Sequence, residues 1–145
     1  MNKENLQNAL AQHYGSMTRS YLSLPCKTFD ICSTEGIKCL AENAGNGAFW
    51  LLDLIGSHQR TIRNLCTNTD AKLRADGEML RDFQVWNIAM EDRIMTVTCI
   101  ADTDHAPVVT QRIEYTDFPL DELTIYVERD GRTETSMTMM LTSER

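Results

Sequence analysis

Residues 47–58, which read GAFWLLDLIGSH, form the densest apolar run in the chain. Seven of the eight side chains from Ala48 to Ile55 are apolar. The run is far shorter than the roughly 18 to 20 residues that cross a bilayer. Positions 48, 51, 52 and 55 recur at helical spacing, and Ile55 is the only β-branched residue among them. The run therefore predicts a central helix, covered on more than one side, with a sheet packed against it.

Three polar residues of this helix invite a chemical interpretation. Asp53 is either a general base held in an apolar setting or, as we favour, a polar edge residue bonded to a neighbour. Ser57 and His58 suggest a nucleophile and its base, but adjacent helical residues point about 100° apart and would not face each other. We expect His58 on the solvent side, near the C-terminus of the helix.

The acidic charge of the chain belongs to its second half. The 145 residues carry a formal net charge of -7, of which residues 1–72 contribute +1 and residues 73–145 contribute -8. A surface of that sign repels phosphate backbones, so we expect no direct nucleic-acid binding. A protein partner with a basic surface fits better.

Length and composition suit one globular domain over residues 1–145. Five cysteines without a CxxC pair indicate free thiols in a reducing compartment. His13, His58 and His105 are scattered and no glycine-rich phosphate loop occurs, so we expect neither a metal nor a cofactor. The first five residues lack the apolar core of a signal peptide, so we expect a cytoplasmic protein that does not enter membranes.

The hydrophobic period changes from helical to alternating at about residue 81. Before that point the sequence predicts two helices and a short strand, over residues 2–13, 35–44 and 28–32, and a polar loop or frayed helix over 67–77. After it the sequence predicts five strands, over residues 83–88, 94–100, 108–115, 123–128 and 133–142. Asp130–Gly131 is a strong hairpin signal. The predicted fold class is α+β, with two or three helices packed on one face of an antiparallel, meander-like sheet of about five strands.

The last predicted strand is rich in methionine. Met137, Met139 and Met140 indicate either adaptable packing or a contact strand at a sheet edge. In the second case, edge pairing between two copies would produce a homodimer.

Two acidic segments are candidate sites. Asp102 and Asp104 form a DxD pair, which in some enzymes holds a divalent cation, although a solvated loop is the simpler interpretation. A small hydrolase could use this pair or Asp53, and it would then depend on a divalent ion or on pH. Nothing else in the sequence demands such a dependence.

The second acidic segment, residues 114–122, reads EYTDFPLDE and places four carboxylates around an aromatic–proline corner. It is either an acidic loop that displays aromatic side chains to a partner or a structural corner. In the structural case, Phe118 fills the core and Pro119 sets the chain direction. Across both segments the predicted interaction residues are Asp102, Asp104, Tyr115, Asp117, Asp121 and Glu122.

The two tryptophans suggest a different class of function. Trp50 and Trp86 are expected to meet across the helix–sheet interface, but either ring could instead stack on a ligand. A sponge that sequesters a nucleotide signal would use such stacking, with Arg60, Arg63 and Arg112 contacting the phosphates. The net negative charge disfavours this alternative.

Four segments resemble a family of small uncharacterised proteins encoded by phages, prophages and plasmids. They are TEGIKCLAENAG, AFWLLDLIGSHQ, FQVWNI and QRIEYTDFPLDELTIYV, within a match of roughly residues 27–128. The chain departs from the family at Asn46–Gly47, which looks like an insertion, and in its methionine-rich tail. The resemblance implies no activity or site residue; it implies a mobile genetic element, whose small proteins often act against host defence.

The favoured hypothesis is a non-enzymatic binding protein of a phage or mobile element. It would inhibit a host defence protein, such as a CRISPR effector, by covering a basic surface with its acidic half. The nucleotide sponge and the small hydrolase are the alternatives.

Overall fold

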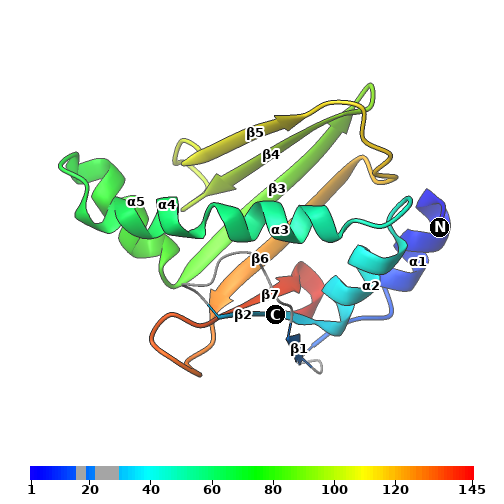
Figure 1. Ribbon diagram of the computed structural model, residues 1–145, viewed down its shortest axis with the longest axis horizontal. Coiled ribbons are helices and arrows are strands. Elements are labelled where there is room, and N and C mark those ends of the chain that lie inside the picture. Colours follow the sequence, from blue (N-terminus) through cyan, green and yellow to red (C-terminus); the bar gives the residue numbers. More distant parts are fainter. Residues whose placement is uncertain (16–18, 22–29) are drawn as a thin grey trace.

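The computed structural model describes residues 1–15, 19–21 and 30–145, and among these residues seven strands form one sheet (Figure 1). The strands are β1 (Arg19–Tyr21), β2 (Ile31–Thr34), β3 (Phe83–Glu91), β4 (Ile94–Ile100), β5 (Val109–Ile113), β6 (Glu122–Arg129) and β7 (Met137–Leu141). The helices are α1 (Lys3–Leu10), α2 (Glu35–Asn43), α3 (Phe49–Ser57), α4 (Gln59–Asn64) and α5 (Ala71–Leu80), with 3-10 helices η1 (Leu65–Thr67) and η2 (Thr142–Glu144).

The α+β class is confirmed, but the strand order is not the predicted meander. The order is β1-β2-β7-β6-β3-β4-β5. Only β3, β4 and β5 follow one another as a meander; residues 114–121 then return the chain, so that β6 pairs with the other side of β3. β2 and β7 are parallel, with Ile31 opposite Met137, which makes the sheet mixed. The predicted numbers of strands and helices were roughly right but somewhat low for the described residues. The N-terminal strands β1 and β2 join the same sheet, and the helices α4 and α5 follow α3.

Residues 67–77 are largely helical. The Asp70 carboxylate accepts hydrogen bonds from the N–H groups of Lys72 and Leu73, at 2.9 and 3.3 Å, and so caps the start of α5. Gly77 allows close packing, because a Cβ there would lie 2.7 Å from the Cβ of Leu65. For the predicted strand over residues 28–32, the described part begins β2 at Ile31, and residues 28 and 29 lie outside the described residues.

The predicted central helix is α3, which crosses one face of the sheet (Figure 1). Leu51, Leu52 and Ile55 are fully buried, as are Trp86 and Ile125 on the sheet face beneath. Each such side chain stabilises the fold by about 1.5–3 kcal/mol through loss of apolar surface to water. No helix of the described residues is long and apolar enough to span a membrane.

A buried amide pair links the helical layer to β3. Gln59 and Gln84 donate to each other's side-chain oxygens at 2.9 and 2.8 Å, and Trp86 Nε1 donates to Gln84 Oε1 at 2.9 Å. These three side chains are buried. The network therefore satisfies the polar atoms that the apolar layer would otherwise leave without partners.

The methionine-rich strand β7 lies inside the sheet, between β2 and β6. Met137, Met139 and Met140 are buried, so they serve packing and do not form a contact strand at an edge. The edges of the sheet are β1 and β5. Any pairing of two copies would therefore have to use another surface.

The C-terminal turn is attached to the start of α2 by a buried carboxylate. Glu144 accepts hydrogen bonds from Thr34 Oγ1 at 2.6 Å, from the Gly36 N–H at 3.1 Å and from the Leu141 N–H at 2.9 Å. A negative charge at this position is stabilised by the positive end of the α2 dipole. Gly36 is required because a Cβ there would lie 2.5 Å from Glu144 Oε1.

A second buried carboxylate shapes the β6–β7 connection. The side chain of Asp130 is 2% exposed and pairs with Arg132, which also reaches Asp30 at 2.9 Å. Burial alone would raise the pKa of the Asp130 carboxyl, but hydrogen bonds from Ser136, Arg132 and Thr138 outweigh it and hold that pKa well below its usual range. The carboxylate therefore stabilises the folded state in its ionised form.

Replacement of Glu144 should destabilise the fold. In Glu144→Gln the amide keeps the size of the side chain but loses its charge and turns an N–H₂ group toward donors, which should cost about 2–3 kcal/mol. Urea unfolding measures the loss. The exposed Glu134, changed to Gln, is the matched control and should have little effect; equal effects of the two changes would contradict the role of Glu144.

Replacement of Asp130 should have a pH-dependent effect. The folded-state pKa lies below the unfolded value of about 3.9, so the stabilisation is fully present above that value and is lost as pH falls toward the folded-state pKa. Asp130→Asn should cost about 3 kcal/mol at pH 7, and the difference from the parent should shrink at about pH 3. Urea unfolding at both pH values measures this, with the exposed Asp53 changed to Asn as control. A difference that stays constant with pH would be contrary to this account.

Candidate protein-binding surface

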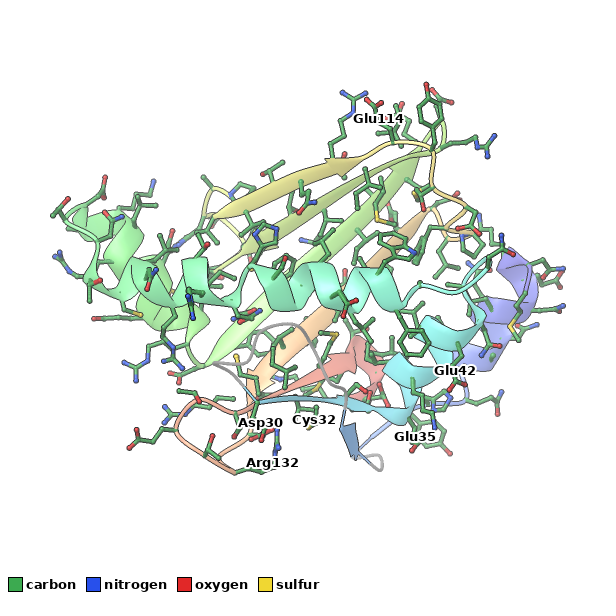
Figure 2. All side chains as sticks on the ribbon, in the orientation of Figure 1. Asp30, Cys32, Glu35, Glu42, Glu114 and Arg132 are labelled. Atoms are coloured by element: carbon green, nitrogen blue, oxygen red, sulfur yellow. The ribbon has the colours of Figure 1, made fainter. Side chains whose placement is uncertain are left out.

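Six carboxylates gather at one end of the sheet, and we call this region the acidic corner. It combines the β3–β4 turn with the segment between β5 and β6. Figure 2 shows Glu114 at this end, on the opposite side of the molecule from Asp30, Cys32 and Arg132. The acidic corner is formed by Glu91, Asp92, Glu114, Tyr115, Asp117, Asp121 and Glu122.

The β3–β4 connection is a two-residue turn made without glycine. Glu91 pairs with Ile94, and the intervening Asp92 and Arg93 have φ angles of 52° and 66°. Both values lie in the left-handed region, as a type I′ hairpin turn requires. The side chains of residues 91–93 are all exposed at the tip, so the turn presents two carboxylates and one guanidinium to solvent.

Tyr115 is the most exposed large side chain of this corner. It is 84% exposed and its φ angle is 58°, a conformation that tyrosine rarely adopts. The next residue is attached to the neighbouring turn, because the Thr116 N–H donates to the Arg93 carbonyl at 3.2 Å. The backbone therefore holds an aromatic ring out in solvent, where it buries almost no surface against its own chain.

The rest of the 114–122 segment is anchored from several sides. Phe118 and Leu120 are buried, which agrees with the structural interpretation of this part of the corner. The Asp117 carboxylate accepts a hydrogen bond from the Asn46 N–H at 2.8 Å. Asp121 forms an ion pair with Lys3 of α1. Contacts of residues 116–121 thus fix the loop on the C-terminal side of Tyr115.

The acidic corner has an excess of negative charge around a shallow cleft. Its six carboxylates face three cations: Arg93, Arg112, which lies 3.9 Å from Glu114, and Lys3. A cleft of about 310 Å³ lies between the β3–β4 turn and residues 116–121. A cationic side chain entering this cleft would therefore meet carboxylates from two segments of the chain.

Elsewhere the acidity of residues 73–145 is compensated in part, whereas Glu78, Asp102, Asp104 and Glu134 are exposed to solvent. Glu144 is buried against backbone donors. Three other carboxylates have basic partners: Asp82 with Arg129, Glu128 with Arg145, and Asp130 with Arg132. The half-chain charge of -8 is therefore not one continuous field.

The predicted Asp102 and Asp104 do not join the corner. They follow β4, whereas Glu114 follows the antiparallel β5, so the two segments lie at opposite ends of that hairpin. Both aspartates are exposed, and Asp102 bonds the adjacent Thr103 N–H at 2.7 Å. The neighbouring His105 places Nδ1 2.6 Å from Oδ1 of the buried Asp76.

The residues proposed for a nucleotide sponge are not assembled into one site. Trp86 is fully buried and bonded to Gln84, so its ring offers no free face. Trp50 is half-buried, and its Nε1 donates to the Gly47 carbonyl at 3.2 Å. Arg112 lies on the uncovered face of the sheet, because its neighbour Gln111 turns to His58 of the helical layer at 2.7 Å.

The elements of hydrolytic chemistry are likewise separate. Asp53 is exposed, and Ser57 donates to the Leu54 carbonyl of its own helix at 2.6 Å. His58 was expected at the solvent side but is half-buried against β5. Among the described residues no group of three or more His, Cys, Asp or Glu could hold a metal ion.

The four described cysteines are free, as expected, and Cys26 lies outside the described residues. Burial raises the pKa of the Cys99 thiol to about 12. Burial also raises the pKa of Cys39. Neither thiol is therefore readily ionised as a nucleophile would be.

Four of the seven residues of the acidic corner are among the predicted interaction residues, because they lie within one acidic segment. The predicted interaction residues include neither Glu91 and Asp92 nor Glu114. The predicted strands over residues 83–88 and 94–100 leave residues 89–93 between them, and three of these are charged. The turn has only two residues because β3 extends to Glu91. That the turn lies beside Tyr115 follows only from the pairing of β4 with β5, which sets Met95 opposite Ile113.

Comparison with known proteins gives a family but no activity. No curated protein and no solved structure matches the chain. The pattern of one family does match, over residues 4–145. The chain belongs to DUF6876, a family of unknown function.

Proposed function

We propose that this chain is a non-enzymatic binding protein that engages a basic protein surface through the acidic corner, with Tyr115 as the aromatic anchor. The observation that carries the proposal is the 84% exposure of Tyr115 on a left-handed backbone, among six carboxylates. Tyrosine is enriched among the residues that dominate binding energy at interfaces. Local backbone strain that the surrounding structure maintains is a feature of functional sites.

Charge selects the class of partner. The carboxylates of the corner would attract a surface rich in lysine and arginine and speed its approach. Phosphate groups would be repelled, which supports a protein partner and not a nucleic acid. The locally paired carboxylates elsewhere contribute much less to this field.

We further propose that the partner is a host defence protein and that the chain is encoded by a phage or another mobile element. This part rests on the resemblance of residues 27–128 to proteins of such elements. RNA-guided effectors hold nucleic acid in positively charged channels, which offer the kind of surface that the acidic corner complements. The chain would then act as an anti-CRISPR-like inhibitor in the host cytoplasm.

Binding experiments with charge-reversed variants test the site. With purified CRISPR effector–guide complexes as the probe, Glu91→Lys combined with Glu114→Lys should slow association about tenfold at low salt. Asp102→Lys combined with Asp104→Lys makes the same charge change at the other end of the β4–β5 hairpin and should have little effect. Equal effects of the two pairs would show that net charge, and not the corner, governs binding.

Removal of the anchor tests the aromatic contribution. Tyr115→Ala should weaken binding about 30-fold, the loss expected for an interface residue worth about 2 kcal/mol. Tyr14 is 71% exposed at the other end of α1 from Lys3, so Tyr14→Ala is the matched control. An unchanged affinity in Tyr115→Ala would remove Tyr115 from the interface.

A plating assay tests the biological role. Expression of the parent chain in hosts with defined defence systems should restore phage plating on at least one of them, and the Glu91→Lys and Glu114→Lys variant should not. Restoration by both proteins would separate the activity from the acidic corner. No restoration on any host would exclude the defence role for those systems.

A further inference from the structure

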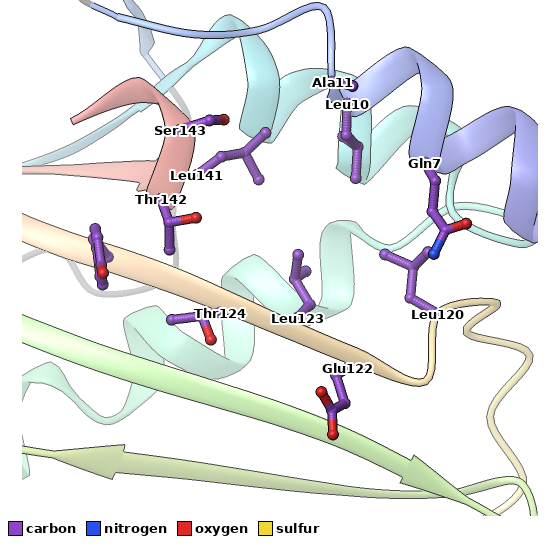
Figure 3. Close-up of a pocket in the computed structure, with 11 residues that line it drawn as sticks. Gln7, Leu10, Ala11, Leu120, Glu122, Leu123, Thr124, Leu141, Thr142 and Ser143 are labelled. Carbon is purple, nitrogen blue, oxygen red and sulfur yellow. The ribbon is translucent and has the colours of Figure 1, made fainter. Parts of the chain in front are cut away.

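A groove lies beside the acidic corner, where β7 ends and the first residues of β6 have no strand beside them on that side. It has a volume of about 580 Å³ and lies between α1, the first residues of β6 and the turn after β7 (Figure 3). Leu10 of α1, Leu123 of β6 and Leu141 at the end of β7 point into it (Figure 3). Its volume falls within the roughly 300–1,000 Å³ of ordinary ligand pockets.

The groove continues the path of β7. The ladder between β6 and β7 ends where Ile125 pairs with Leu141, after which the chain turns into η2. β6 begins three residues earlier, at Glu122, and there it pairs with β3 alone among the described strands. Residues 122–124 are therefore an edge within an otherwise internal strand.

The hydrogen-bond ladder between β3 and β6 determines which backbone groups of β6 face the groove. The Met90 N–H donates to the Asp121 carbonyl at 2.8 Å, so odd-numbered residues at this end of β6 turn their polar groups toward β3. By alternation, both backbone polar groups of Glu122 and the N–H of Thr124 face the groove. No strand of the described residues pairs with Glu122 or Thr124 on that side.

We propose that this groove takes an extended, basic segment of the partner protein as an added strand of the sheet. The segment would lie in the path of β7, antiparallel to β6, and bond to the backbone of Glu122 and Thr124. This inference deepens the proposed function, because Glu122 belongs both to the acidic corner and to the groove.

Strand geometry specifies the sequence of the guest. Side chains directly opposite each other in an antiparallel pair lie on the same face. The guest residue opposite Leu123 would be aliphatic and would contact Leu10, Leu123 and Leu141. The two guest residues opposite Glu122 and Thr124 would have their side chains on the other face of the sheet. The guest residue opposite Glu122 would be lysine or arginine. Glu122 is the only charged side chain that the described residues contribute to the groove, so a cation has no competing repulsion there.

Two peptides of equal composition test the pattern. The probe is a blocked five-residue peptide in which lysine alternates with valine, and its control has the three lysines followed by the two valines. NMR titration of the full chain should show the alternating peptide binding about fivefold tighter, with the Glu122 and Thr124 amide signals shifting. Methylation of the amides that face β6 should abolish this preference. Equal binding of the two peptides would overturn strand addition.

Two substitutions at one position test the backbone contact. Thr124→Pro removes the N–H that faces the groove, and Thr124→Val retains it; both remove the hydroxyl bond to Asn87, 3.0 Å in length. The proline variant should bind the alternating peptide about tenfold more weakly than the valine variant. Equal affinities would overturn the proposal; if the proline variant does not fold, the methylated peptide decides.

The outcomes separate this inference from the proposed function. Equal peptide binding, together with a loss of effector binding in the Glu91 and Glu114 variant, would remove strand addition and leave the acidic corner standing. A preference for the alternating peptide, together with effector binding that is unchanged in the Glu91 and Glu114 variant, would support strand addition in the groove and contradict the proposed function.

Discussion

The contact between α3 and the inner face of the sheet is the constraint on which the other features depend. Leu51, Leu52 and Ile55 have no exposed surface, and they stay so only while one face of β3, β4 and β6 remains apolar. Because side chains alternate along a strand, the opposite face carries polar residues such as Asn87, Thr98 and Arg112 together with the apolar or aromatic Phe83, Val85, Ile100 and Tyr126. The uncovered face of the sheet is therefore mixed in character, and the carboxylates of the acidic corner lie at its end.

Local periodicity predicted the elements better than their arrangement. The alternation in residues 83–100 and the helical spacing in 48–55 are properties of short segments, and the structure confirmed both. The parallel pairing of Ile31 with Met137 joins residues more than 100 positions apart, and no local pattern carries that information. The same limit applies to the candidate site. Tyr115 and Asp121 are close in sequence, whereas Arg93 reaches them only through the return of the chain after β5.

Net charge was an incomplete guide for a physical reason. Asp130 and Glu144 carry formal charge, but each is buried among donors that the fold supplies, and each stabilises a chain connection. A carboxylate of that kind contributes to folding and projects little field into solvent. Six of the remaining carboxylates gather at one end of the sheet, and that grouping gives the charge there a direction.

The ion pair between Lys3 and Asp121 offsets part of the negative charge of the acidic corner, yet it is weak enough for a cation of a partner to replace Lys3. Its side chains are 47% and 75% exposed, so the pair is well hydrated and worth at most about 1 kcal/mol. α1 does not depend on it, since Leu6 and Leu10 are buried and anchor the helix to the core. A lysine or arginine from a partner can therefore replace Lys3 at Asp121 without unfolding α1. The corner and the groove share that helix and Glu122, so a basic segment in the groove would bring its own cations to the carboxylates beside it.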